Sequence, residues 1–221
     1  CGLLGPSGSG KSTLLNIIGG IDAADEGDIC IEGERMADMK EKKLTAYRRK
    51  HLGYIFQMYN LIPNLTVREN LMLIARLYGA NKADAAGRSE AAMREFGLSA
   101  RARDRAKTLS GGMQRRLSIA MALITKPNVL FLDEPTLGLD VRARRELWKT
   151  ISALKGKVTV VLTTHYLEEA EALADRIGIM HEGRLQALGT AAALCAETNT
   201  TNFEDAFLAL TESESEKEAA L

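Results

Sequence analysis

The stretch Gly5–Thr13, GPSGSGKST, decides the fold of this chain. It matches the phosphate-loop pattern, in which two glycines five residues apart are followed by Lys and by Ser or Thr. Glycines let the backbone turn so tightly that successive N–H groups point at one anion. Lys11 can place a cation on the β- and γ-phosphates, and the hydroxyl of Ser12 can bind Mg²⁺. A strand-like Leu3-Leu4 precedes the loop and an apolar helical pattern follows it, a context that favours this interpretation over a plain Gly/Ser-rich turn before a helix.

The sequence therefore predicts binding of a nucleoside triphosphate with Mg²⁺. We expect the nucleotide to be held by the whole loop, which consists of Gly5, Pro6, Ser7, Gly8, Ser9, Gly10, Lys11, Ser12 and Thr13.

Length and composition set the limits of the remaining interpretation. The 221 residues suit one large domain or a domain with a subdomain. The 29 basic and 29 acidic residues balance, which gives no support to a nucleic-acid surface. Cys1, Cys30 and Cys195 are dispersed and odd in number, so we interpret them as reduced thiols. No apolar run approaches the ~18 to 20 residues that span a bilayer, and no signal peptide is visible. Since the chain begins with Cys1 so close to the loop, we expect its first strands to be missing.

Local patterns predict an α/β fold with a helical interruption. Alternating residues over 27–36 predict a hairpin that turns at Glu32-Gly33. Buried strands are predicted at 52–56, 129–132 and 158–162, and a second hairpin is predicted over 177–188 around Glu182-Gly183. Helices are predicted from the Thr66 capping box to residue 77, over 82–96, after Ser110, around 147–154 and over 166–174. We expect a domain at 1–190 with a helical insertion at about 60–125, then a C-terminal helix and a disordered acidic tail within 191–221.

Three polar residues that follow predicted strands are candidates for catalysis. Asp133 ends a buried strand, where ligands bind in open α/β sheets, so we expect it to be a Mg²⁺ partner. Glu134 comes next and could orient or deprotonate an attacking water, although Asp133-Glu134-Pro135 alone would also suit a polar turn. His165 also ends a strand, yet a lone His is more often structural. Gln57 ends a third strand.

The segment Leu109–Gln114, LSGGMQ, predicts a second anion site. Ser110 is placed to cap the helix that follows, and Gly111 and Gly112 expose the first N–H groups of that helix. In isolation this segment would equally suit a glycine-rich helix start.

Taken together, these motifs resemble the ATP-binding-cassette (ABC) ATPases. GPSGSGKST, the Gln57 segment, LSGGMQRR, VLFLDEP, GLD at 138–140 and His165 occur in the order and spacing of that family, from Gly2 to about Leu188. The resemblance implies a P-loop NTPase (RecA-like) core with a parallel sheet, a small antiparallel β part and an inserted α-helical subdomain.

The resemblance also implies roles for individual residues. Two cassettes would pack head to tail, so that Ser110, Gly111, Gly112 and Gln114 serve the ATP of the partner. Glu134 would be the catalytic base and His165 the switch at the γ-phosphate. Ser12, Gln57 and Asp133 would serve Mg²⁺, with Gln57 and Lys11 contributing to catalysis. Asp140 would lie in the loop that couples the two sites. The aromatic residue on which the family stacks adenine would lie upstream of Cys1.

The resemblance favours an export system over other cassettes. Segments 109–140, 163–190 and 202–211 look most like cassettes of drug, polysaccharide and lipid exporters, whereas LNIIGGIDAADEG at 15–27 resembles lipoprotein-release and macrolide-type cassettes. We therefore expect an ATP-hydrolysing subunit at the cytoplasmic face of the cell membrane, paired with separate transmembrane permease subunits. A soluble cassette acting on ribosomes or DNA is the alternative, although such proteins usually carry two cassettes or a coiled-coil insertion. An unrelated kinase-like enzyme would not explain LSGGMQ.

Overall fold

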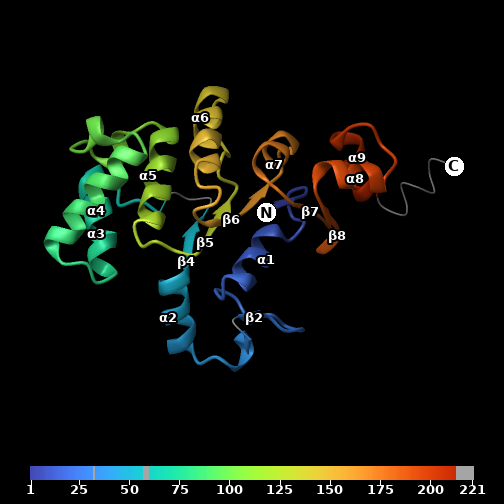
Figure 1. The fold of residues 1–221 in the computed structure, drawn as a ribbon, viewed down its shortest axis with the longest axis horizontal. Helices are drawn as coiled ribbons and strands as arrows, with labels where there is room; N and C mark the ends of the chain where they lie inside the picture. The colour runs from blue at the N-terminus through green and yellow to red at the C-terminus, as the bar shows by residue number, and fades with distance from the viewer. Residues whose placement is uncertain (32, 57–59, 213–221) are drawn as a thin grey trace.

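The structure, a computed structural model, describes residues 1–31, 33–56 and 60–212. Its centre is a six-stranded sheet of order β4-β5-β6-β1-β7-β8, which is parallel except for β8, antiparallel to β7. These strands are β1 (Gly2–Leu4), β4 (Leu52–Ile55), β5 (Val129–Asp133), β6 (Thr159–Thr164), β7 (Ile177–His181) and β8 (Arg184–Gly189). A separate antiparallel pair, β2 (Cys30–Ile31) and β3 (Glu34–Arg35), lies apart from the sheet (Figure 1).

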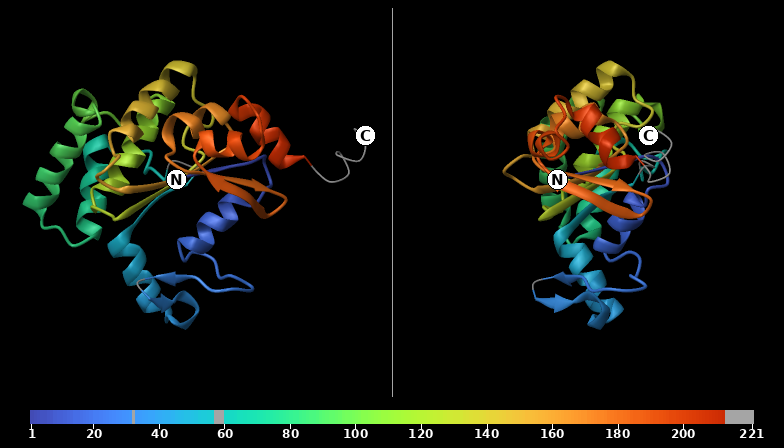
Figure 2. Two further views of the ribbon diagram at one scale, coloured as in Figure 1. Left: turned by 45° about the vertical axis from the view of Figure 1, so that its right-hand side comes forward. Right: turned by 90° about the vertical axis from the view of Figure 1, so that its right-hand side faces the viewer.

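Helices cover both faces of the sheet, as Figure 2 shows. On one face lie α1 (Lys11–Ile18) and the end of α2 (Glu41–His51). The other face carries the larger group of helices, which comprises α5 (Gly111–Leu123), α6 (Val141–Ser152), α7 (Leu167–Leu173), α8 (Ala191–Glu197) and α9 (Phe203–Thr211), with α3 (Val67–Leu77) and α4 (Lys82–Glu95) packed beyond α5. Short 3₁₀ turns occur at Met36–Asp38, Ser99–Arg101 and Ala106–Thr108.

Strand β5 shows why the sheet has a hydrophobic core on each of its two faces. Side chains alternate between the faces of a strand, so Leu130 and Leu132 pack under α5 and α6, whereas Phe131 packs on the opposite face with Leu15 of α1. All four side chains are almost completely buried. The continuous apolar run therefore reflects a strand that is covered on both faces, as expected for a doubly wound α/β protein.

Most predicted elements are present with small shifts of their ends. The hairpins, the three buried strands and the helices of 60–125 all occur, and Thr66 forms the predicted capping box with Glu69 at the start of α3. Glu182 and Gly183 both have positive φ, 47° and 76°, as a two-residue hairpin turn requires. The predicted turn residue Glu32, Gln57 and most of the predicted acidic tail, 213–221, lie outside the described residues.

Three features differ from the sequence-based expectations. Helix α2 was not predicted, because none of its residues is buried and its sequence has no apolar period. The neighbours of β1 are β6 and β7, both from later in the chain, rather than upstream residues. The region after residue 190 contains two helices instead of one, and Phe203 of α9 is buried in the same cluster as Leu4 of β1.

Within the described part of the chain, no helix is both long and apolar enough to cross a lipid bilayer.

Candidate nucleotide-binding site

The phosphate loop joins β1 to α1 at the carboxyl edge of the sheet. Gly5 cannot be replaced without a clash, because a Cβ there would lie 2.2 Å from the carbonyl oxygen of Met180. Gly8 and Gly10 have φ of 81° and 89°, in the left-handed region that favours glycine. Gly10 is the N-cap of α1 and supplies no side-chain capping hydrogen bond. The start of α1 therefore offers its N–H groups and the positive end of its dipole to an anion.

Lys11 lies in the middle of this loop. Its side chain is 4% exposed, and Nζ donates to the carbonyl oxygens of Gly5 and Pro6 at 2.8 Å each and to Oγ of Ser9 at 3.4 Å. Burial lowers the pKa of Lys11, and the carboxylates of Glu134 and Asp133 partly offset that effect. The loop thus holds a cation at its centre that phosphate oxygens can share.

Ser12 and Asp133 converge from opposite parts of the sequence. The hydroxyl of Ser12 donates to Oδ1 of Asp133 at 2.9 Å, and the same carboxylate oxygen accepts a hydrogen bond from Thr163 at 2.6 Å. Thr163 lies in β6, in register with Asp133 of β5. Mg²⁺ prefers such oxygen ligands and takes few of them from the protein, since it keeps waters and phosphate oxygens. The hydroxyl and carboxylate oxygens found together here fit Mg²⁺.

Glu134 is held in an uncommon backbone conformation beside these groups. Its φ is 45°, and its N–H donates to Oγ1 and to the carbonyl oxygen of Thr163 at 3.0 and 3.2 Å. Its Oε1 lies 3.3 Å from Nδ1 of His165, which stands at the end of β6. The His165 ring also packs against Tyr166, with centroids 4.1 Å apart. A partly exposed carboxylate next to an imidazole can bind a water and accept its proton.

The remaining loop residues surround this group. Pro6, Ser7 and Thr13 are exposed, whereas Ser9 is buried beneath Lys11. Lys11, Ser12, Asp133, Glu134 and His165 are therefore brought to one edge of the sheet. Gln57 lies outside the described residues, although its neighbour Phe56 follows β4 at the same edge.

The second predicted anion site is separate from the first. Ser110 is the N-cap of α5, and its Oγ accepts from the N–H of Met113 at 3.4 Å. Gly112 approaches α6 so closely that a Cβ would lie 3.1 Å from Cβ of Ala143. The side-chain amide of Gln114 donates to the carbonyl oxygen of Ala106 at 3.1 Å. Among the hydrogen bonds of the described residues, none joins this segment to the phosphate loop.

Two residues of the site escaped the sequence reasoning. Thr163 contacts both Asp133 and Glu134, and Arg115 of α5 donates to the carbonyl oxygens of Asp133 and Glu134. The available signal for Arg115 was its helical position, four residues before the apolar Ile119, which places a charge on the buried face of α5.

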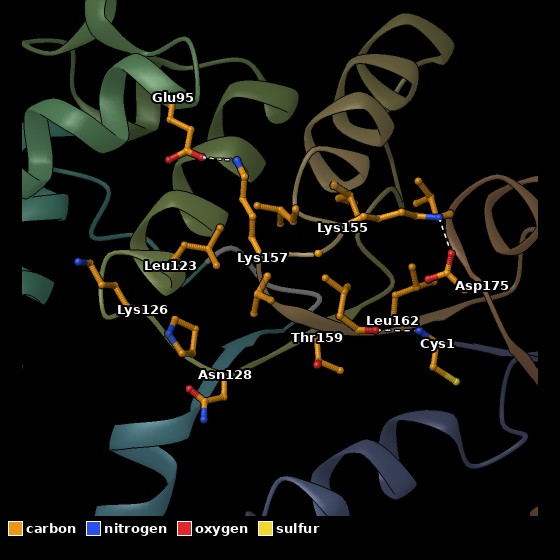
Figure 3. A pocket seen from close by; sticks show the side chains of 17 residues that line it. Cys1, Glu95, Leu123, Lys126, Asn128, Lys155, Lys157, Thr159, Leu162 and Asp175 are labelled. Atoms are coloured by element: carbon orange, nitrogen blue, oxygen red, sulfur yellow. Dashed lines mark hydrogen bonds and ion pairs between the residues drawn. The ribbon is translucent and has the colours of Figure 1, made fainter.

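A cavity of about 880 Å³ lies at the opposite, amino end of β5 and β6 and is shown in Figure 3. Four of its charged side chains form ion pairs, Lys155 with Asp175 at 2.9 Å and Lys157 with Glu95 at 3.6 Å. Ligands of parallel α/β sheets bind at the carboxyl edge. This cavity therefore does not compete with the phosphate loop as the nucleotide site.

Comparison with known families agrees with this geometry. Residues 1–137 match the family model of the ABC transporter. The chain belongs to the ABC transporter family.

Similar proteins of this family include several ATP-binding proteins of resistance and export systems. The chain is 41% identical to the linearmycin resistance ATP-binding protein LnrL of Bacillus subtilis (strain 168), over 88% of this chain and 61% of that protein. It is 42% identical to the Nod factor export ATP-binding protein I of Paraburkholderia xenovorans (strain LB400), over 88% of this chain and 63% of that protein. The chain thus spans about three fifths of the length of the curated relatives it matches.

A solved structure shares most of this fold. The dimeric post-hydrolysis state of the ATP-binding cassette MJ0796 bound to ADP and Pi is 33% identical, with a TM-score of 0.76 over 86% of this chain and 84% of that one. The cassette fold, with its phosphate loop at the carboxyl edge of a mainly parallel sheet, is therefore shared with an ADP-bound protein.

Proposed function

We propose that this chain binds and hydrolyses ATP and powers an exporter. The observation that carries the proposal is the convergence of Lys11, Ser12, Asp133, Glu134 and His165 at one edge of the sheet. These residues come from three separate segments, and an anion-binding loop, an oxygen-ligand pair and a carboxylate–imidazole pair meet there. Such a set serves phosphoryl transfer to water.

The mechanism relies mainly on positioning and charge. The loop N–H groups and Nζ of Lys11 bind the phosphates, and Lys11 exchanges its carbonyl partners for phosphate oxygens. Ser12 and Asp133 would hold Mg²⁺, which would supply neutralisation of the negative charge of the nucleotide. Glu134 orients the attacking water and accepts its proton, and His165 holds that carboxylate and contacts the γ-phosphate. We include Gln57 in this set on the family resemblance.

A second copy of the chain, or a related cassette, completes the site. The start of α5 carries Ser110, Gly111, Gly112 and Gln114, which the proposal assigns to the nucleotide of the partner. The cassette MJ0796 was solved as a dimer bound to ADP and Pi, which supports a dimer, and the family resemblance suggests its head-to-tail arrangement. ATP binding would close the dimer, and hydrolysis would reopen it.

We also propose that the chain acts at the cytoplasmic face of the membrane with separate transmembrane chains, and the names of two relatives support the export part of this proposal. Their names refer to linearmycin resistance and Nod factor export. The rival function, a soluble cassette acting on ribosomes or DNA, finds no support in the balanced charge of 29 basic and 29 acidic residues.

The hydrolysis part is tested with Lys11→Ala and, as a matched control, the exposed Lys82→Ala. We expect Mg²⁺-dependent release of phosphate from ATP by the wild-type chain and by the control. Lys11→Ala should lose about 100- to 1,000-fold in kcat, the usual effect of removing one preorganised donor. Equal rates for the two variants would contradict the site assignment.

The export part is tested by sequencing the neighbouring open reading frame and co-expressing this chain with the product, which the proposal expects to be a hydrophobic membrane chain. Co-expression should carry the cassette into the membrane pellet, and Lys11→Ala should pellet equally, because it alters the nucleotide loop only. A cassette that stays in the supernatant and sediments with ribosomes would support the rival function.

A further inference from the structure

Arg115 is a buried cation that the proposed mechanism does not use. It lies in the second turn of α5 and is 1% exposed. Its guanidinium donates to four main-chain carbonyl oxygens. Nε reaches Pro135 at 2.8 Å, Nη2 reaches Asp133 at 2.9 Å and Glu134 at 3.1 Å, and Nη1 reaches Phe56 at 2.7 Å. One side chain thus joins α5 to the segments that follow β4 and β5.

The backbone of Glu134 needs support from its surroundings. Its φ of 45° lies in the left-handed region, which is disfavoured for a residue that carries a side chain. Thr163 of β6 fixes the N–H of Glu134 through two acceptors. On the other side of the residue, the carbonyl oxygen accepts from Arg115 and from the N–H of Leu137. The direction of the Glu134 side chain therefore depends on contacts at both of its peptide groups.

The geometry of these contacts requires arginine. The guanidinium is a planar fork with five donors, so it can reach several carbonyls that lie around one plane. A lysine ammonium has its three donors on one nitrogen, so it cannot reach acceptors that are spaced apart as those of Nε, Nη1 and Nη2 of Arg115 are. Burying a charge without such hydrogen bonds is costly, which holds the side chain in this arrangement.

Arg115 also connects two parts of the proposed enzyme. It lies five residues after Ser110, the N-cap of the same helix. Any displacement of α5 relative to β5 must strain or break the hydrogen bonds of the guanidinium. A contact made at the start of α5 can thus change the position of Glu134 without a contact to the nucleotide of its own chain.

We infer that Arg115 is a positioning residue for hydrolysis, which holds the main chain of Glu134 and ties it to α5. This inference rests on the proposed hydrolytic function. Because Arg115 acts through Glu134, its loss should lower kcat and leave nucleotide affinity nearly unchanged.

The test compares Arg115→Lys and Arg115→Met with Ile119→Ala. Ile119 is completely buried in the same helix, so its truncation destabilises the protein without removing a hydrogen bond to the β4 and β5 ends. We expect both Arg115 variants to lose about 10- to 100-fold in kcat, as small misplacements of catalytic groups do. Their KM for Mg-ATP and their Kd for ADP should stay within about threefold of wild type. Ile119→Ala should keep its kcat at temperatures where it is folded.

Hydrogen exchange of the nucleotide-free chain provides a readout that needs no activity. The amides of Glu134, Thr136 and Leu137 should exchange faster in both Arg115 variants and not in Ile119→Ala. If the wild-type chain hydrolyses no ATP but this exchange pattern is found, the proposed function fails and the positioning role stands.

The inference is overturned if the Arg115 variants keep wild-type kcat and exchange. It is also overturned if they lose kcat and ADP affinity together, in proportion to stability, as a general packing defect would. Failure of both variants to fold would overturn it as well, because Arg115 would then serve folding alone.

Discussion

The chain contains two glycine-rich helix starts, and they differ in what surrounds them. At the start of α1, the N-cap is Gly10 without a side-chain capping bond, and a buried Lys11 lies beside it. At the start of α5, Ser110 already accepts the N–H of Met113, so one donor of that helix is occupied. Side chains from β5 and β6 reach the first helix start, whereas the second contacts α6 through Gly112.

This difference shows why a helix N-terminus is not a catalytic site by itself. Its partial positive charge attracts an anion, but hydrolysis also needs a metal ligand and a base. The sheet supplies both at α1, because Asp133 ends β5, Glu134 follows that strand and His165 follows β6. Among the described residues, no carboxylate or imidazole is hydrogen-bonded to the segment Ser110–Gln114 at the start of α5. The comparison favours a role for α5 as half of a site that a second cassette completes.

Among the variants predicted here, Glu134→Gln should lower kcat the most. It tests directly whether the base of hydrolysis lies at the start of α1. The amide cannot accept a proton from water, so kcat should fall by about 100- to 10,000-fold, the usual contribution of general base catalysis. ATP should still bind, because the phosphate-loop contacts of Lys11 are unchanged. Gel filtration with ATP and Mg²⁺ should reveal a long-lived dimer. The matched control is the exposed Glu95→Gln, and a Glu134→Gln chain that hydrolyses ATP like this control would show that Glu134 is not the base.

The second prediction concerns the start of α5. Ser110→Arg should abolish hydrolysis without weakening nucleotide binding to the same chain, because the bulky cation would block only the nucleotide of the partner. Mixing Ser110→Arg chains with Lys11→Ala chains creates dimers that carry one intact composite site. Phosphate release by the mixture, compared with each variant alone, is the measurement.

Recovery of activity in the mixture would support independent sites across the dimer. Proven heterodimers without any recovery would contradict either the arrangement across the dimer or the independence of the two sites. A nucleotide Kd that rises in Ser110→Arg alone would place α5 at the nucleotide of its own chain and remove the contrast between the two helix starts.

Asp133→Asn should have a smaller effect, which concerns the Mg²⁺ concentration that ATP hydrolysis requires. The amide keeps an acceptor for Ser12 and Thr163 but loses the negative charge. The Mg²⁺ concentration for half-maximal ATP hydrolysis should rise by about 10- to 100-fold, as changes near metal ligands typically cause. A partly exposed control outside the site, Asp104→Asn, should leave it unchanged. An unchanged Mg²⁺ requirement in Asp133→Asn would remove this carboxylate from the metal site.

The elements of the site could be predicted where a short segment carries its own signal. The phosphate loop has fixed glycines and Lys11, the run before Asp133 is continuously apolar, and Thr66 and Glu69 form a local capping box. In each case, residues fewer than ten positions apart determine the structure. The family resemblance then indicated that these segments belong to one fold of known architecture.

Contacts between distant residues could not be predicted in this way. The pairing of β1 with β6 and β7 joins residues more than 150 positions apart, and nothing in Leu3-Leu4 identifies those partners. Helix α2 has no fully buried residue and only a partly buried face around Tyr47, and its mostly charged sequence shows no apolar period. In the sequence, Arg115 resembles a surface arginine. Its role becomes visible only in the folded chain, where its guanidinium donates to carbonyl oxygens at the ends of β4 and β5.

The smallest expected effect concerns Glu169, a carboxylate outside both helix starts. It is completely buried in α7, and its Oε1 accepts from Nε1 of Trp148 at 3.0 Å. Burial raises the pKa of Glu169, against the opposing influence of the nearby Thr164, Trp148 and Thr136 side chains and of Arg144. Glu169 therefore differs from Asp133 and Glu134 in position, because its carboxylate is buried in the protein away from the proposed nucleotide site.

The sign of the pH dependence follows from this raised pKa. Between the ordinary pKa of Glu and the raised value, the folded chain binds more protons than the unfolded chain, so the free energy of unfolding decreases as pH rises through that window. Glu169→Gln has no such titration and can still accept from Trp148. The advantage of the variant in Tm should therefore grow from about pH 4.5 upward and level off above the raised pKa, with about 2–4 °C for each kcal/mol in a chain of this size. Melting curves of both proteins from pH 4.5 to pH 8 measure it. A difference in Tm that is constant with pH would mean that Arg144 and the three neighbouring side chains fully offset the effect of burial on the pKa. A difference that increasingly favours wild type as pH rises would mean that they stabilise the charged carboxylate more than burial disfavours it.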